Sequence, residues 1–373
     1  MTIMTMRIFK TFELFLVLLL VACSGTASGQ SHELALDEII ERYTDAIGGR
    51  ENIKAIENLV YSQGTYQEGD FKWDGAMMSM ARPYYKLVGD KNKPEGYMEG
   101  YDGSAWEYLG DPRVVVRTDG PPSEAIRHYA GVERPLFEYW LKGSAAELLG
   151  ETSFGRKPVY VIKLTRRDNY VEQFYLDKES FMVVAVSGEA PIHAFGPEVK
   201  TLTRLSDYRP VAGVLIAHTD ETVFMPSEEP QSSMQWGKIE TNVDLPVDWF
   251  SPPAFERTRT EKLIEDLYGQ RADWTSMLWT YEEFRRGFPD IDTSTPVNIA
   301  GFQILKMGQV KNAIRLLERN TEDNPDSAQT RFGLGRAYRT DGRLDEAKEQ
   351  FQKALEIDPG YEQAARALAD IGG

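Results

Sequence analysis

The chain has 373 residues, with 42 Lys and Arg against 58 Asp and Glu, a formal net charge of −16 and a pI near 4.9. Apolar residues make up 42% and aromatic residues 11%, which excludes a disordered chain and is enough for two folded domains. The acidic balance argues against a nucleic-acid partner, because binding to phosphates needs a basic surface. The single cysteine excludes an internal disulfide and a cysteine-based zinc site.

The first 30 residues have the pattern of an export signal. Arg7 and Lys10 precede a short apolar run over residues 15–22, which is too short to cross a membrane. The run ends in Leu-Val-Ala before Cys23, which resembles the lipobox of bacterial lipoproteins. That resemblance implies cleavage before Cys23, a diacylglycerol on its thiol and an acyl chain on its amine.

We therefore expect a signal peptide over residues 1–22, lipidation at Cys23 and a flexible tether of small residues over residues 23–33. Several acyl chains on one residue are sufficient for stable anchoring in a membrane. Ser24, rather than Asp, follows the cysteine, which is compatible with the outer membrane by analogy with enteric lipoproteins. The alternative is an ordinary signal peptide with an incidental cysteine.

The middle of the chain opens with a helix and then changes to strands. Apolar residues at helical spacing predict a helix over residues 36–47, which Gly48 and Gly49 end. Runs with strand character, most of them separated by turn residues, follow at residues 59–66, 71–80, 84–88, 105–109, 114–117, 159–165, 171–176, 182–186, 201–208, 214–224 and 236–243. No long crossover helix separates them, so the sheet should be antiparallel. Helical segments are expected at residues 121–130 and 135–141.

Four stretches of this region resemble LolA/LolB-like periplasmic proteins. They are residues 36–59, 100–106, 206–209 and 243–253. That superfamily folds as an unclosed β-barrel with a helical plug, and its cavity accommodates lipid or acyl chains. The resemblance implies an α+β fold, with an antiparallel unclosed β-barrel and a helical plug, over residues 34–255.

A carrier of this kind needs an apolar concave face that its own side chains do not fill. The run at residues 159–165 is apolar on both faces, so it must be covered on both sides. The residues expected to line a cavity are Tyr160, Ile162, Leu164, Trp106 and Tyr139. The alternative is that aromatic side chains from the first half of the barrel fill this space as ordinary core.

The C-terminal region repeats itself at a spacing of 34 residues. The offset aligns Gly301 with Gly335, Gly308 with Gly342, Ala313 with Ala347 and Pro325 with Pro359. This pattern resembles the tetratricopeptide repeat (TPR), with repeats over residues 294–327 and 328–361 and a closing helix. We expect an all-α TPR domain of helical hairpins over residues 294–373, joined by helices within residues 256–293.

In TPR proteins, one side of the first helix of each repeat faces a concave groove. The positions that correspond to it here are Asn298, Phe302, Leu305, Lys306, Phe332, Arg336 and Arg339. Three cations and two aromatic side chains on an acidic protein suggest a groove for an acidic or mixed peptide. The alternative is an ordinary solvated helix face.

The search for catalytic and metal-binding patterns is negative. None of the four histidines has a second His or a Cys at ligand spacing, and no nucleophile or nucleotide-binding motif occurs, so no catalytic residue, metal or cofactor is predicted. His218 shares a strand face with Ile216 and Asp220 and is interpreted as structural rather than catalytic. Glu95, Glu99 and Asp102 are interpreted as a solvated group rather than a calcium site.

These patterns predict a non-enzymatic lipoprotein of the bacterial cell envelope, anchored by Cys23 in the outer membrane and facing the periplasm. Its half-barrel would bind lipid or another apolar ligand, and its TPR tail would bind a protein partner. One alternative is a scaffolding lipoprotein whose barrel is filled and binds no ligand. A hydrolase is a further alternative, because similar repeat tails occur on serine hydrolases, although the nucleophile motifs are absent.

Overall fold

The computed structural model describes residues 34–69, 71–89, 96–120, 123, 126–128, 132, 134–190 and 199–372. The predicted signal peptide, Cys23 and the predicted tether lie outside these residues. Every helix and strand below belongs to one compact unit that begins at Leu36.

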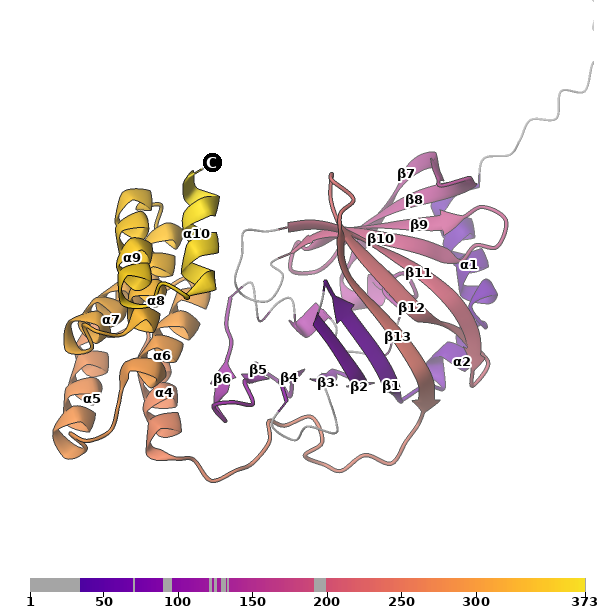
Figure 1. Cartoon of the computed structure of the whole chain (residues 1–373). Coiled ribbons are helices and arrows are strands. Elements are labelled where there is room, and N and C mark those ends of the chain that lie inside the picture. Colours follow the sequence, from indigo (N-terminus) through magenta and orange to yellow (C-terminus); the bar gives the residue numbers. More distant parts are fainter. Residues whose placement is uncertain are drawn as a thin grey trace, which may run out of the picture. The chain divides into compact units, whose positions relative to one another are not determined.

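A single antiparallel sheet forms the first part of this unit (Figure 1). Its strands are β1 (Asn58–Glu68), β2 (Phe71–Ala81), β3 (Tyr84–Val88), β4 (Met98–Tyr101), β5 (Ala105–Tyr108), β6 (Val115–Arg117), β7 (Ala145–Phe154), β8 (Lys157–Thr165), β9 (Val171–Asp177), β10 (Val183–Ala190), β11 (Val199–Val211), β12 (Val214–Phe224) and β13 (Pro230–Thr241). The order is β6-β5-β4-β3-β2-β1-β13-β12-β11-β10-β9-β8-β7. The two end strands, β6 and β7, do not pair, so the barrel is unclosed, as the sequence predicts.

The sheet has all the predicted strands and two more. β4 and β7 are the additional strands; β4 pairs with β3 and β5, and β7 pairs with β8. The helix predicted over residues 121–130 lies largely outside the described residues, of which 126–128 are helical. The helix predicted over residues 135–141 is a turn followed by the short 3-10 helix η1 (Tyr139–Lys142), because Gly143 at φ 73° ends it after one turn.

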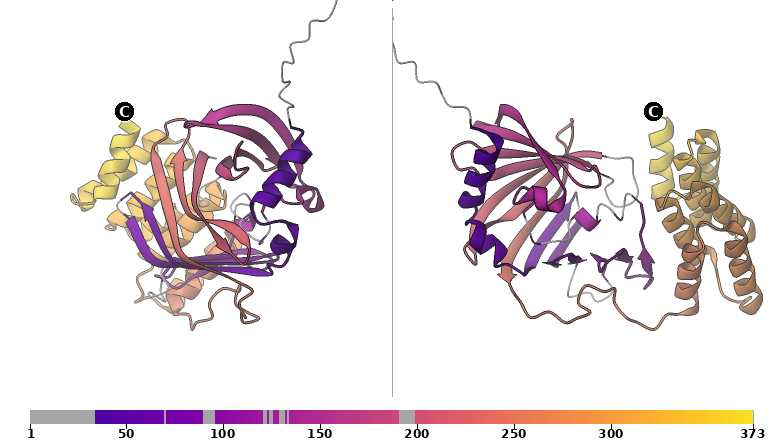
Figure 2. Two further views of the ribbon diagram at one scale, coloured as in Figure 1. Left: turned by 90° about the vertical axis from the view of Figure 1, so that its right-hand side faces the viewer. Right: turned by 180° about the vertical axis from the view of Figure 1, so that it is seen from behind.

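Two helices precede the sheet, α1 (Leu36–Ala46) and α2 (Arg50–Lys54). α1 buries Ile39, Ile40 and Tyr43, which share one face because they are spaced by one helical turn. At its end, the carbonyl of Ile47 accepts a hydrogen bond of 2.7 Å from the amide of Leu215 at the start of β12. Figure 2 shows the sheet curling, with α1, α2 and the short helical turns inserted before β7 on its concave side.

The C-terminal part is entirely helical (Figure 1). Its helices are α4 (Arg259–Gly269), α5 (Trp274–Gly287), α6 (Ser294–Lys306), α7 (Val310–Asp323), α8 (Ala328–Thr340), α9 (Leu344–Ile357) and α10 (Glu362–Gly372). Within the two predicted repeats, glycines allow the helices to approach closely. A Cβ added at Gly301 would overlap Leu317, and one added at Gly335 would lie 2.5 Å from Phe351.

Helix α4 covers the free edge of β6. Its side chains bond to backbone groups at alternate positions of this edge: Glu261 Oε1 accepts from the amide of Arg113 (3.1 Å), Glu265 Oε1 accepts from the amide of Val115 (3.1 Å), and the hydroxyl of Tyr268 donates to the carbonyl of Arg117 (2.7 Å). Val114 and Val116 belong to the same buried apolar cluster as Leu263 and Leu267. α4 therefore takes the place of a further strand and protects an edge that would otherwise be open to pairing.

Candidate functional site

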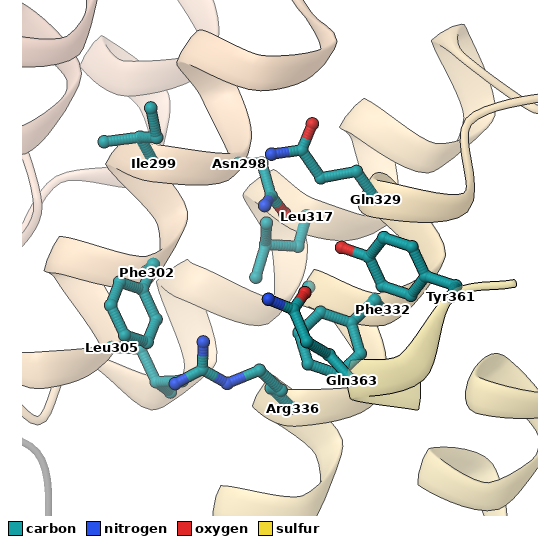
Figure 3. A pocket seen from close by; sticks show the side chains of 11 residues that line it. Asn298, Ile299, Phe302, Leu305, Leu317, Gln329, Phe332, Arg336, Tyr361 and Gln363 are labelled. Carbon is teal, nitrogen blue, oxygen red and sulfur yellow. The ribbon is translucent and has the colours of Figure 1, made fainter. Parts of the chain in front are cut away.

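A groove on the helical tail brings together five of the seven residues predicted for partner binding. Asn298, Phe302 and Leu305 come from α6, and Phe332 and Arg336 come from α8. The groove has a volume of about 330 Å³ and is completed by Ile299, Leu317, Gln329, Gly333, Tyr361 and Gln363. Figure 3 shows Phe302 and Leu305 on one side, Gln329 and Tyr361 on the other, and Asn298 between them.

Arg336 lies between two aromatic rings of this groove. Its guanidinium carbon is 4.1 Å from the centre of the Phe302 ring and 5.8 Å from that of Phe332. Burial, and then the nearby Arg339, lower the pKa of Arg336. Among the described residues, no carboxylate pairs with it. A partly desolvated cation that lacks an anionic partner favours an anionic group of a ligand.

Asn298 supplies a second polar group that has no partner within the described chain. Its Oδ1 atom is buried and accepts no hydrogen bond there. Gly333 on α8 makes room for it, since a Cβ at this position would overlap the Asn298 oxygen. A backbone N–H of an extended peptide is the kind of donor that this oxygen lacks.

Lys306 and Arg339, which the sequence also placed on the groove, do not line it. Lys306 is buried and points to the sheet, where its Nζ lies 2.8 Å from Glu107 Oε2 on β5. Arg339 lies three positions beyond Arg336, the last groove residue of α8, and its Nη1 atom is 4.0 Å from Asp370 Oδ2 of α10. The prediction for Lys306 is wrong because the sequence pattern of a repeat does not reveal that α6 packs against another part of the chain.

Three of the predicted cavity residues lie in β8 and are covered by the protein itself. Tyr160, Ile162 and Leu164 are all buried, and Ile162 is 0% exposed. Tyr160 stacks on Phe181 with ring centres 6.1 Å apart, and Arg42 of α1 lies over the same Phe181 ring. This side of β8 therefore faces α1, so a ligand could reach it only if α1 or its neighbours moved.

Trp106 lies on the other side of the sheet from the inserted segment. Its ring N–H donates a hydrogen bond of 3.0 Å to the carbonyl of Phe250, while the adjacent Ala105 packs with Ile126 of the insertion. Neighbouring residues of a strand point to opposite faces, so Trp106 cannot line the same cavity as Ile126. Tyr139 is half-buried on η1, in an edge-to-face contact with Trp140 at 5.2 Å.

Polar groups also lie within the half-barrel, which the sequence analysis did not predict. Burial raises the pKa of Asp220 on β12 to about 7. Burial also raises the pKa of Tyr43 to about 12, and the charge of Arg134 opposes this rise. The Nη2 atom of Arg134 is buried and has no hydrogen-bond partner among the described residues. The sequence gives one signal for these buried polar groups, namely that Asp220 lies on the apolar face of its strand.

The histidines and acidic residues take structural roles. His218 is buried, with its Nδ1 3.0 Å from the carbonyl oxygen of Ile216. Glu99, expected to be solvated, is buried and accepts hydrogen bonds from the hydroxyls of Tyr85 (3.1 Å) and Tyr97 (2.9 Å). That expectation is wrong because Glu99 lies in β4, a strand that the sequence analysis missed. Glu95 lies outside the described residues.

The structure also joins His128 to Asp168, at 2.7 Å between Nε2 and Oδ2, a pair 40 positions apart. His128 stacks on Tyr170, with ring centres 4.2 Å apart, and Arg127 also contacts Asp168. Burial lowers the pKa of His128, although the bond to Asp168 opposes this shift. The pair holds the inserted segment on the β8–β9 turn. Within the described residues, no cluster of three His, Cys, Asp or Glu could hold a metal ion.

Comparison with known proteins gives matches for both parts of the chain. The tetratricopeptide repeat family model matches residues 305–371. A search of curated proteins finds no match. A solved LolA superfamily protein from Nitrosomonas europaea is similar, with 13% identity over 59% of this chain and 99% of that chain and a TM-score of 0.40. A DUF1329 family protein from Desulfovibrio piger has 12% identity over 58% of this chain and 97% of that chain, with a TM-score of 0.37.

The TPR family model thus covers most of the helical tail, as the sequence predicts. In the part of the chain that the structure describes, every helix is too short or too polar to cross a membrane.

Proposed function

We propose that this protein is a non-enzymatic lipoprotein of the bacterial envelope that binds a protein partner through its helical tail. In this proposal, acylated Cys23 anchors it in the outer membrane with the folded part in the periplasm. The observation that carries the proposal is the groove between α6 and α8, where Arg336 has no carboxylate partner and Asn298 Oδ1 accepts no hydrogen bond among the described residues.

The chemistry of the groove favours an extended peptide with an acidic side chain. The carboxylate would bind Arg336, and a peptide N–H would bind Asn298 Oδ1. Phe302 and Phe332 would pack on the apolar parts of the peptide and keep water from the ion pair.

The half-barrel is proposed as the site of a lipid or another apolar ligand, by analogy with the carriers that the middle region resembles. Because Tyr160, Ile162 and Leu164 are covered by the protein, uptake would require α1 or the inserted segment to move. The same burial favours a second candidate, a scaffolding lipoprotein with a filled barrel. Native mass spectrometry of the purified protein distinguishes the two, because a carrier would retain lipid and a scaffold would not.

Binding to an array of synthetic peptides that differ in acidic content tests the partner proposal. The wild-type chain should retain acidic peptides, and Arg336→Ala should lose them. Arg339→Ala is the matched control, because it removes a neighbouring cation that lies outside the groove. Equal binding by both variants, or no preference for acidic peptides in the wild type, would contradict the proposal and indicate that the tail has a structural role.

A further inference from the structure

The 3-10 helix η1 exposes two large apolar side chains next to each other. Trp140 is 51% exposed and Leu141 is 70% exposed. An adjacent Trp and Leu in water is costly for a soluble protein and marks a surface that contacts something apolar.

The turn that carries these side chains is held firmly. Nζ of Lys142 donates hydrogen bonds to the carbonyls of Arg134 (2.8 Å) and Phe137 (2.9 Å), and the amide of Leu141 donates to the carbonyl of Glu138 (3.0 Å). Phe137 itself is buried below the turn. The exposure of the Trp–Leu pair is therefore fixed by the fold rather than being a property of a loose loop.

Two cationic side chains of α2 lie next to this turn. Arg50 and Lys54 of α2 both pair with Glu138, the residue before η1, and their side chains are about half exposed. Arg50 also lies over the Phe137 ring, with its guanidinium carbon 5.5 Å from the ring centre. Arg50, Lys54 and Glu138 together carry one net positive charge, on a chain of net charge −16. An aromatic tip with basic neighbours suits the boundary between anionic headgroups and acyl chains.

The position of η1 in the fold connects it to the predicted anchor. The carboxylate of Asp37, the second residue of α1, contributes to raising the pKa of Tyr139, after burial. η1 is thus near the start of α1, where the N-terminal segment joins the folded part. About 12 residues separate Cys23 from Leu36, and a flexible chain of that length would have a mean span of roughly 20 Å. An acyl anchor at Cys23 would keep η1 close to the bilayer.

We propose that Trp140 and Leu141 insert into the surface of a lipid bilayer and that Arg50 and Lys54 bind its anionic headgroups. This contact would set which side of the folded part faces the membrane. The proposal rests on the proposed envelope location, and it does not require the acyl chain for its test.

The test uses the chain from Ser24 to Gly373, which lacks the cysteine but contains every helix and strand described above. The probes are vesicles of phosphatidylethanolamine and phosphatidylglycerol, and binding is measured by co-sedimentation. We expect the wild-type chain to bind and the Trp140→Ser/Leu141→Ser variant to bind at least about tenfold more weakly, from the apolar area that each side chain would bury. Brominated lipids should quench the fluorescence of the wild type more than that of Trp140→Phe.

Trp279→Ser is the matched control, since Trp279 on α5 is 63% exposed and lies far along the chain from η1. It should bind vesicles as the wild type does. Equal binding by the double variant, or an equal loss in Trp279→Ser, would overturn the proposal. A wild-type chain that ignores vesicles and instead forms a dimer that the double variant loses would also overturn it. A failure of lipidation at Cys23 would leave these measurements unchanged, so the two hypotheses can fail separately.

Discussion

Lys306 Nζ on α6 lies 2.8 Å from Glu107 Oε2 on β5, and their side chains are only 3% and 4% exposed. This ion pair joins the helical tail to the sheet across 199 positions of sequence. It lies beside the apolar cluster that β6 shares with α4, α5 and α6. The sheet and the tail are therefore packed together in one core, rather than being joined by a linker alone.

Removing one partner of this pair should destabilise the protein strongly. Lys306→Met leaves Glu107 buried without its cation, and we expect a loss of about 3–5 kcal/mol in the free energy of unfolding. Replacing both partners, Lys306→Met with Glu107→Leu, should recover most of that loss. Urea denaturation measures both effects. The control is Lys262→Met, which breaks the exposed pair with Asp266 and should cost less than about 1 kcal/mol. A loss for Lys306→Met no larger than the control would contradict the expected burial.

Gly333→Ala should impair the groove without unfolding the tail. The added methyl group overlaps the position of Asn298 Oδ1, so the Asn298 side chain must leave its place. We expect the affinity for acidic peptides to fall several-fold, while the thermal midpoint changes little because alanine favours the helix. Fluorescence anisotropy and calorimetry measure the two quantities. Gly269→Ala on α4 is the control, since nothing lies within 4 Å of its new methyl group. Unchanged affinity in Gly333→Ala would exclude Asn298 as a ligand contact.

Asp220 should make the protein less stable as the pH rises. Its pKa in the folded protein is about 7, against an ordinary value of 3.8, so the folded state binds the proton more tightly than the unfolded state does. Wild-type stability should therefore fall between about pH 4 and pH 7, by up to roughly 4 kcal/mol. The Asp220→Asn variant has no titrating group at this position, so the free energy of unfolding of the variant should increase relative to that of the wild type as the pH rises across this range. Unfolding curves at several pH values test this, with Glu221→Gln, an exposed neighbour, as the control. Parallel pH profiles for Asp220→Asn and the wild type would refute it.

Cys23→Ser should release the protein from the membrane fraction while its folded part stays intact. The physical reason is that burial of the acyl chains would supply the attachment. Cell fractionation and metabolic labelling with a radioactive fatty acid measure the two consequences. Ser28→Ala, a change within the predicted tether, should remain in the membrane fraction and keep its label. Retention of Cys23→Ser in the membrane with no change in labelling would mean that the cysteine is not the anchor.

The sequence predicts the local structure better than it predicts the contacts between distant segments. The 34-residue spacing of Gly301 and Gly335 reveals the repeats, because each glycine meets a side chain of the paired helix. β7 is absent from the predicted strands, since its sequence AAELLGETSF is rich in residues that favour helices, whereas in the fold it pairs with β8.

The candidate site could be predicted only in part, because the sequence shows local patterns but not the contacts between distant segments. Asn298, Phe302 and Arg336 follow from the repeat pattern, which is local. Lys306 follows the same pattern and yet is buried against Glu107. The repeat spacing does not indicate that α6 packs on β5. Trp106 does not line the expected cavity, because the segment that covers it, around Phe250, lies 144 positions away and leaves no local pattern.

Because α4 covers β6, the sheet cannot be separated from the helical tail without exposing the edge of β6. A fragment that stops before Thr258 would keep all the strands but would leave the amides of Arg113 and Val115 without the carboxylates that now accept their hydrogen bonds. It would also expose Val114 and Val116 to water. Such a fragment should associate with itself along this edge, so a shorter functional relative would need another element in place of α4.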